Sequence, residues 1–227
     1  MYLNFDLLKR VLLRSKEIVD EAGVNPVLVQ VYKKSLEGPA NAFLAAHAAV
    51  TKASIAVNKE NAEALDAIDA LATPYAGARS TIMAVLPETA GALPATLKSL
   101  PTDTDKLWAI GTLLEAIEER AGEAWADALL AGELGTKAPA TIKEVHEAID
   151  AIKEFAAASQ DRTAAYGPAC DKFYAFKRVV RDLLGASSKQ YRRIHVRGSA
   201  KSLGENEGAG GSEAGGTSSP EGAAANG

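Results

Sequence analysis

Cysteine, long apolar runs and an N-terminal targeting pattern are missing or nearly missing from this sequence. Its 227 residues include one cysteine, Cys170, which excludes an intrachain disulfide framework. Nowhere do about 18 apolar residues follow one another, so we expect no transmembrane segment. Asp6 stands where a signal peptide has its basic region, and Lys9 and Arg10 interrupt the apolar residues that follow. These features predict a cytoplasmic protein.

An excess of one charge and runs of strand-forming residues are also absent. The 25 Lys and Arg residues against 29 Asp and Glu residues give a net charge of -4, which provides no general attraction to nucleic acid. β-branched and aromatic residues do not cluster as they do in strands. Alanine is abundant instead, with 45 residues, and it has the highest helix propensity. The composition predicts an all-α fold.

Helix caps divide the first 40 residues into two expected helices. Asn4 can cap a helix that ends near Ala22, before Gly23. Asn25 and Pro26 then provide a cap and a first-turn proline for a second helix. We expect that helix to end at residues 38–39, Gly-Pro.

A long heptad pattern follows, and it predicts a helix that packs along a partner helix. A continuous helix over residues 40–86 would be about 70 Å long, and Pro74 should kink it. The alternative is a hairpin at Asn58. We prefer one helix because the register does not change across that residue. The heptad positions, spaced alternately by four and three residues, are mostly apolar: Leu36, Ala40, Phe43, His47, Val50, Ser54, Val57, Asn61, Ala64, Ile68, Leu71, Tyr75, Ala78, Ile82 and Val85.

In the second half of the chain, the sequence predicts a connection over residues 87–101 and three further helices. Thr102 opens the first of these, which Gly132 and Gly135 end. The second runs from near Pro139 to Leu184. Its expected buried stripe is Ile142, Val145, Ile149, Ile152, Ala156, Ser159, Thr163, Tyr166, Cys170 and Phe173. The third is a short helix with a capping box formed by Ser187 and Gln190.

The composition changes after Gly198 to Gly, Ser, Glu and Ala. Residues 199–227 contain almost nothing that could be buried, so we predict a disordered tail. The expected organisation is a helical bundle over residues 1–198, elongated and built from long antiparallel helices, followed by this tail.

Two short segments look familiar: Leu100-Pro101-Thr102-Asp103-Thr104-Asp105-Lys106-Leu107 and Leu184-Gly185-Ala186-Ser187-Ser188-Lys189-Gln190-Tyr191-Arg192-Arg193-Ile194. The chain resembles a loose group of uncharacterised bacterial all-helical proteins whose last long helix ends in Leu-Gly, followed by a Ser-rich cap and a Tyr-containing turn. The resemblance implies the fold over residues 26–197 and brings no activity with it.

Signatures of catalysis and of metal binding are not recognisable. The sequence has no nucleophile elbow, phosphate loop or dinucleotide fingerprint, so we predict no enzyme activity and no cofactor. His47, His146 and His195 lack the Glu-x-x-His spacing of helical metal sites, and we predict no metal. We interpret His47 as a core residue, with a hydroxyl such as Ser159 or Thr163 as its partner. We interpret Cys170 as a structural cysteine of the core rather than a nucleophile.

Basic residues are concentrated near the end of the last long helix. Tyr174 and Tyr191 lie among them, and basic residues interleaved with aromatic residues suit phosphate binding and base stacking. The alternative is a core helix whose C-terminal dipole favours basic residues. The candidate anion-binding residues are Lys177, Arg178, Arg181, Arg192, Arg193 and Arg197.

These patterns favour a non-enzymatic structural or protein-interaction bundle. We expect its partner to be a protein, either a different protein or a second copy of the chain, rather than a nucleic acid. Two alternatives stay open. The first is a nucleic-acid or anion binder that uses the basic helix. The second is a coat protein whose amphipathic helices cover a lipid or polymer surface.

Overall fold

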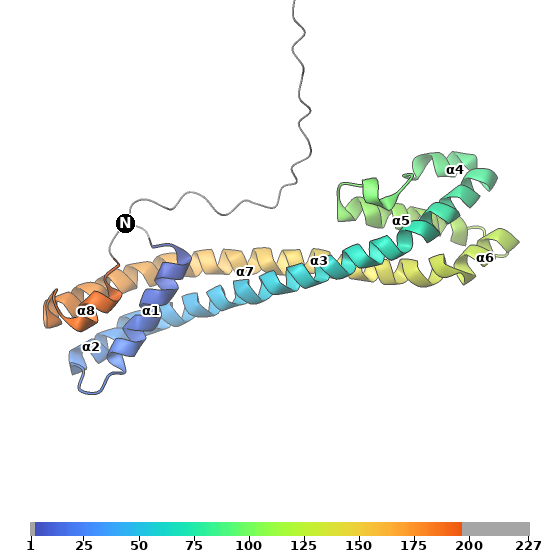
Figure 1. Cartoon of the computed structure of the whole chain (residues 1–227). Helices are drawn as coiled ribbons and strands as arrows, with labels where there is room; N and C mark the ends of the chain where they lie inside the picture. Colours follow the sequence, from blue (N-terminus) through green and yellow to red (C-terminus); the bar gives the residue numbers. More distant parts are fainter. Residues whose placement is uncertain (1–2, 197–227) are drawn as a thin grey trace, which may run out of the picture.

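The computed structural model describes residues 3–196, apart from the side chains of residues 89 and 90, and all regular elements in that range are helical. Arg197 and the predicted tail, residues 199–227, lie outside the described residues. Two long helices lie antiparallel along the molecule, and shorter helices cover their ends (Figure 1). The prediction of an all-α, elongated bundle is confirmed. The helices are α1 (Phe5–Val19), α2 (Pro26–Val31), α3 (Glu37–Val85), α4 (Pro87–Ala92), α5 (Asp103–Glu118), α6 (Ala124–Ala131), α7 (Glu133–Leu184) and α8 (Lys189–Ile194).

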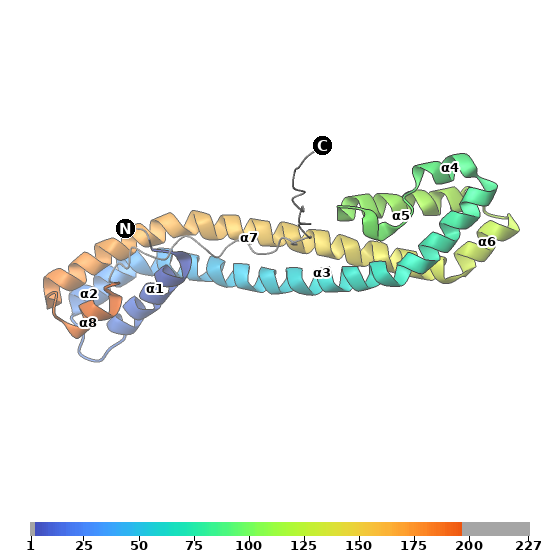
Figure 2. The same ribbon diagram turned by 45° about the horizontal axis from the view of Figure 1, so that its top comes forward.

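Helix α3 is continuous, so the prediction of one helix is confirmed and the hairpin at Asn58 is wrong. The heptad positions are buried from Leu36 to Val50 and from Ala64 to Ile82. Pro74 lies inside the helix, and α3 changes direction in its C-terminal part (Figure 2).

The start of α3 differs from the prediction, because residues 38–39, Gly-Pro, do not end a helix. A π-helical turn, Tyr32–Leu36, joins α2 directly to α3. The backbone N–H of Glu37 donates to the carbonyl of Tyr32, five residues earlier. This wider turn changes which carbonyl each backbone N–H bonds to just before Pro39. The proline, which has no N–H, therefore lies where the regular α-helical hydrogen bonds are already interrupted.

The predicted single helix after Thr102 is two helices. Thr102 does cap α5, and its Oγ1 accepts a hydrogen bond from the N–H of Asp105 at 3.1 Å. The helix then stops, because Gly122 adopts a φ of 95° and its N–H donates to Asp127 Oδ1 at 2.9 Å. Beyond Ile117, the positions that continue its face at helical spacing are Ala121, Ala124 and Ala128, which provide too little apolar area to hold a continuous helix on the core.

The predicted boundaries around α7 and α8 also need correction. Helix α7 begins at Glu133, so Pro139 and Gly135 lie inside it rather than at its edge. The cap of α8 is Ser188 instead of Ser187, and its Oγ accepts from the N–H of Tyr191 at 3.2 Å. The expected connection over residues 87–101 contains α4 and a 3-10 turn, Leu97–Ser99, whose Leu97 is fully buried.

The predicted stripe of α7 is buried at Val145, Cys170 and Phe173, but between Val145 and the waist the buried positions are displaced by one residue. Ala148 and Ala151 are buried, whereas Ile149 is half-buried and Ile152 is 46% exposed. Isoleucine is the more apolar residue, but α3 packs against α7 here and small side chains allow close approach of two helices. Steric fit therefore overrides hydrophobicity.

Two hydrophobic cores lie at opposite ends of the α3–α7 pair. The proximal core joins α1, α2, α8 and the adjoining parts of α3 and α7, and its largest fully buried members include Phe43, Phe173 and Phe176. The distal core joins α5, α6 and the other ends of α3 and α7, and includes Tyr75 and Leu113. Between them lies the waist, residues 51–63 of α3 and 152–168 of α7, in which no residue is buried.

Candidate functional site

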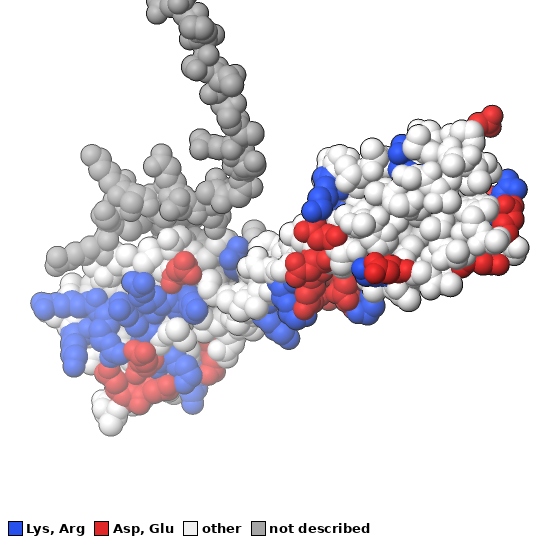
Figure 3. Space-filling view, turned by 45° about the vertical axis from the view of Figure 1, so that its right-hand side comes forward, with Lys and Arg blue, Asp and Glu red and all other residues white. Residues whose placement is uncertain are grey.

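The candidate anion-binding residues that the structure describes lie at the end of the molecule that contains the proximal core. Figure 3 shows Lys and Arg side chains gathered on one face of that end, with acidic side chains beside them. The structure separates the six candidates into three groups. Lys177, Arg178 and Arg181 share a pocket, Arg192 and Arg193 lie on α8, and Arg197 is outside the described residues.

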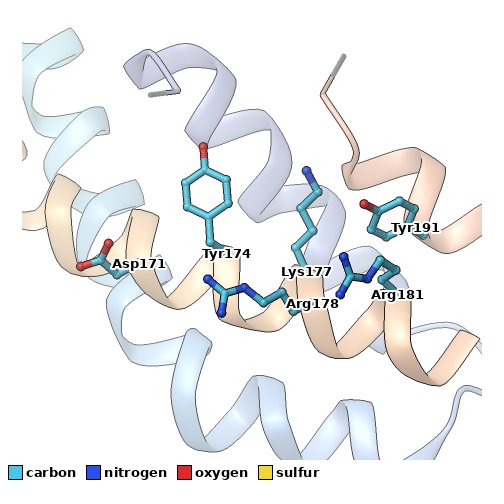
Figure 4. A pocket seen from close by; sticks show the side chains of 6 residues that line it. All are labelled: Asp171, Tyr174, Lys177, Arg178, Arg181 and Tyr191. Carbon is cyan, nitrogen blue, oxygen red and sulfur yellow. The ribbon is translucent and has the colours of Figure 1, made fainter. Parts of the chain in front are cut away.

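The pocket has a volume of about 490 Å³ and lies between the C-terminal part of α7 and α8. Figure 4 shows the Arg178 side chain extending toward the base of Tyr174, the Arg181 side chain passing beside Tyr191, and Lys177 between Tyr174 and Tyr191. Three cationic side chains and one carboxylic acid side chain line the same hollow. The lining residues are Asp171, Tyr174, Lys177, Arg178, Arg181 and Tyr191.

Lys177 is the least exposed of the three cations. It is half-buried, and burial lowers the pKa of its ammonium group because removing water disfavours the charged form. Its Nζ lies 5.9 Å from the centre of the Tyr191 ring, within the range of a cation–π contact. Arg181 is more exposed, and its Nε donates to Asp182 Oδ1 at 3.0 Å.

Arg193, another of the predicted anion-binding residues, does not line the pocket. Its guanidinium binds Glu17 Oε2 at 2.6 Å and also pairs with Glu21. Arg14 donates to the Arg193 carbonyl at 3.0 Å. These contacts hold α8 against α1, and two carboxylates already neutralise the charge. Arg192, by contrast, is exposed.

His47 is a core residue, as predicted, but its predicted partner is wrong. The residue is 8% exposed, and its Nε2 lies 3.6 Å from Asp6 Oδ1 on α1. Nδ1 has no hydrogen-bond partner among the described residues, and the hydroxyl of Thr163 donates to the carbonyl of Ser159 instead. Burial lowers the pKa of His47, and the nearby Lys9 lowers it further, while Asp6 opposes the shift.

Cys170 is buried in the proximal core, in agreement with the sequence interpretation. Burial raises the pKa of its thiol. Since the thiolate is the reactive form, this environment makes the cysteine a poor nucleophile.

An acidic cluster that the sequence analysis did not identify lies where α3 meets α7. Carboxylate oxygens of Glu60, Glu63 and Glu144 lie within 4.8 Å of one another. Lysines compensate for it on both helices: Lys59 Nζ is 2.9 Å from Glu63, and Lys143 Nζ is 3.4 Å from Glu144. The cluster joins residues about 80 positions apart in the sequence, so no local spacing could reveal it.

The waist exposes apolar side chains on both long helices. Ile55 is 67% exposed on α3, and Ile152 and Phe155 are 46% and 36% exposed on α7. A shallow hollow of about 460 Å³ lies farther along α7, lined by Ser159, Gln160, Thr163 and Ala164. The predicted stripe Ile152, Ala156, Ser159 and Thr163 therefore remains largely unpaired within the described chain.

The continuous helix Pro26–Val85 is long and apolar enough to cross a membrane by length and composition, and 22% of its most apolar window is buried. Core helices and signal sequences pass the same test. The absence of a transmembrane segment and the cytoplasmic location therefore stay predictions.

No family model, curated protein or solved structure matches the chain.

Proposed function

We propose that the protein is a non-enzymatic structural protein that binds another helical partner through its waist. The observation that carries the proposal is the exposure of Ile55, Ile152 and Phe155. Single exposed apolar residues are normal on protein surfaces. These three, however, lie where α3 and α7 run without a covering helix in the described chain (Figures 1 and 2).

The spacing of the exposed residues on α7 favours a helix as the partner. Ile152, Ala156, Ser159 and Thr163 follow one another at intervals of four and three, the period of helix–helix packing. Small residues at three of these positions allow close approach. A second antiparallel pair laid on the waist would complete a four-helix bundle, and a second copy of the chain provides such a pair.

Self-association tests this proposal. Sedimentation equilibrium of the full chain should give a dimer, and Ile152→Lys should shift it to a monomer, because a charged side chain would be buried in the interface. Val27→Lys is the matched control, since Val27 is 50% exposed on α2, outside the waist. A wild-type chain that stays monomeric near millimolar concentration would contradict binding to a second copy.

A second candidate function, a coat on a lipid or apolar polymer surface, is favoured by the charge distribution of α3. Between Ala40 and Val57, Lys52 is the single residue of the Asp, Glu, Lys and Arg types. Flotation of the protein with phosphatidylcholine vesicles tests this candidate. Flotation that Ile55→Lys abolishes would support it over the dimer.

A further inference from the structure

The cations of the proximal pocket have an arrangement that helix stability alone does not explain. Lys177 and Arg181 are four residues apart on α7, and Arg178 and Arg181 are three apart. Like charges at these spacings destabilise a helix. The helix dipole favours cations in the last turn, and this accounts for Arg181. Lys177 lies about two turns before the end of α7 at Leu184 and is outside that effect.

The pocket is also poor in compensating carboxylates. Arg181 pairs with Asp182, and Asp171 lies in the lining. Lys177 and Arg178 form no ion pair with a carboxylate of residues 3–196. Three cations thus face one hollow with one carboxylate in its wall, and Lys177 is partly desolvated there. An anion in the hollow would offset both the desolvation and the mutual repulsion.

We infer that the pocket between α7 and α8 binds a polyphosphate group, as a free polyphosphate or as the phosphate chain of a nucleotide. Arg178 and Arg181 offer forked guanidinium donors that match phosphate oxygens, and Lys177 adds a third cation. The volume of about 490 Å³ falls in the range of small-molecule sites. Lys177 and Arg178 are the lining cations without an ion pair to a described carboxylate, and the several oxygens of a polyphosphate can bind both of them and Arg181 at once, which a single carboxylate cannot. The inference is independent of the waist.

Isothermal titration of the full chain with inorganic triphosphate and with ATP tests the inference. Wild type should bind triphosphate with a sub-millimolar Kd. Arg178→Gln and Lys177→Met should each weaken binding about 10-fold or more, because a hydrogen bond between charged groups is lost. Arg178 is exposed, so its variant keeps the test valid if Lys177→Met disturbs folding. Arg192→Gln removes the same charge outside the pocket and should change Kd less than about twofold.

Comparing the affinities for triphosphate and for ATP distinguishes a free polyphosphate from a nucleotide as the ligand. Equal affinity for triphosphate and ATP would assign the site to the polyphosphate group alone, and clearly tighter binding of ATP would assign it to a nucleotide. Three results would overturn the inference: no binding of either probe, an equal loss in Arg192→Gln, or tighter binding of a single-stranded oligonucleotide than of either probe. The last result would make the proximal face a nucleic-acid surface.

Discussion

His47 shows how one buried residue can make the stability of the whole protein depend on pH. It is nearly enclosed between α1 and α3, its Nδ1 lacks a partner among the described residues, and Lys9 and Arg162 add positive charge nearby. All three conditions disfavour the protonated imidazole, and the exposed Asp6 compensates only in part. The folded chain therefore binds this proton less readily than the unfolded chain does.

The sign of the pH effect follows from that difference. The pKa of His47 is lowered in the folded state, so on acidification the unfolded chain takes up the proton first, near its ordinary pKa of about 6.5. The free energy of unfolding should thus fall as the pH drops below that value. His47→Leu should remove the part of this decrease in the free energy of unfolding that His47 causes. Near pH 7.5 the substitution should change the free energy of unfolding by about 1 kcal/mol or less.

Urea unfolding between pH 5 and 8 measures this effect. His146→Gln is the control, because His146 is exposed on α7 and should leave the slope of stability against pH close to that of wild type. An unchanged slope in His47→Leu would contradict a lowered pKa in the folded protein.

At the scale of the element, Gly135 permits the tight passage from α6 into α7. A Cβ atom at this position would lie 1.8 Å from the Leu130 carbonyl oxygen, a backbone atom. Gly135→Ala should therefore destabilise the protein by about 1–3 kcal/mol or more, because the backbone must shift. Gly111→Ala in α5 is the control. A Cβ there meets nothing within 4 Å, and alanine should stabilise the helix by up to about 1 kcal/mol. Thermal unfolding of both variants checks the opposite signs, and a neutral Gly135→Ala would contradict the close approach.

The helices illustrate which features a sequence can predict. The register of α3 was predictable because large apolar residues such as Phe43, Ile68 and Tyr75 mark one face over many turns. The predicted register of α7 is wrong only near Ile152, because both Ile152 and Ala151 suit a helix and the choice between them depends on how closely α3 approaches. The sequence predicts a helix end at Gly135, because no local pattern distinguishes a glycine that ends a helix from one that avoids a clash with the backbone of a neighbouring turn.

The candidate site was predictable only in part for a related reason. Basic residues close together in the sequence, such as Lys177, Arg178 and Arg181, lie on one helix and share a pocket. Arg193 looked equivalent, but Glu17 and Glu21 neutralise it from the other end of the chain. A pairing across that many residues depends on the tertiary fold, and charge counting along the sequence does not detect it.

At the scale of the whole molecule, the described chain has two hydrophobic cores that share only α3 and α7. The waist between them contains no buried residue, so little apolar area couples the two ends. Regions with separate cores can open independently of each other. We therefore expect damage to one core to remain largely local.

Leu113→Ala tests this expectation, because Leu113 is fully buried in the distal core and its truncation should cost about 2–5 kcal/mol. Native-state hydrogen exchange should show reduced amide protection in α5 and α6, with protection in α1 and α8 nearly unchanged. Phe176→Ala, in the proximal core, should produce the reverse pattern at a cost of about 3–5 kcal/mol. Equal loss of protection at both ends in either variant would mean that α3 and α7 couple the cores into one cooperative unit despite the exposed waist.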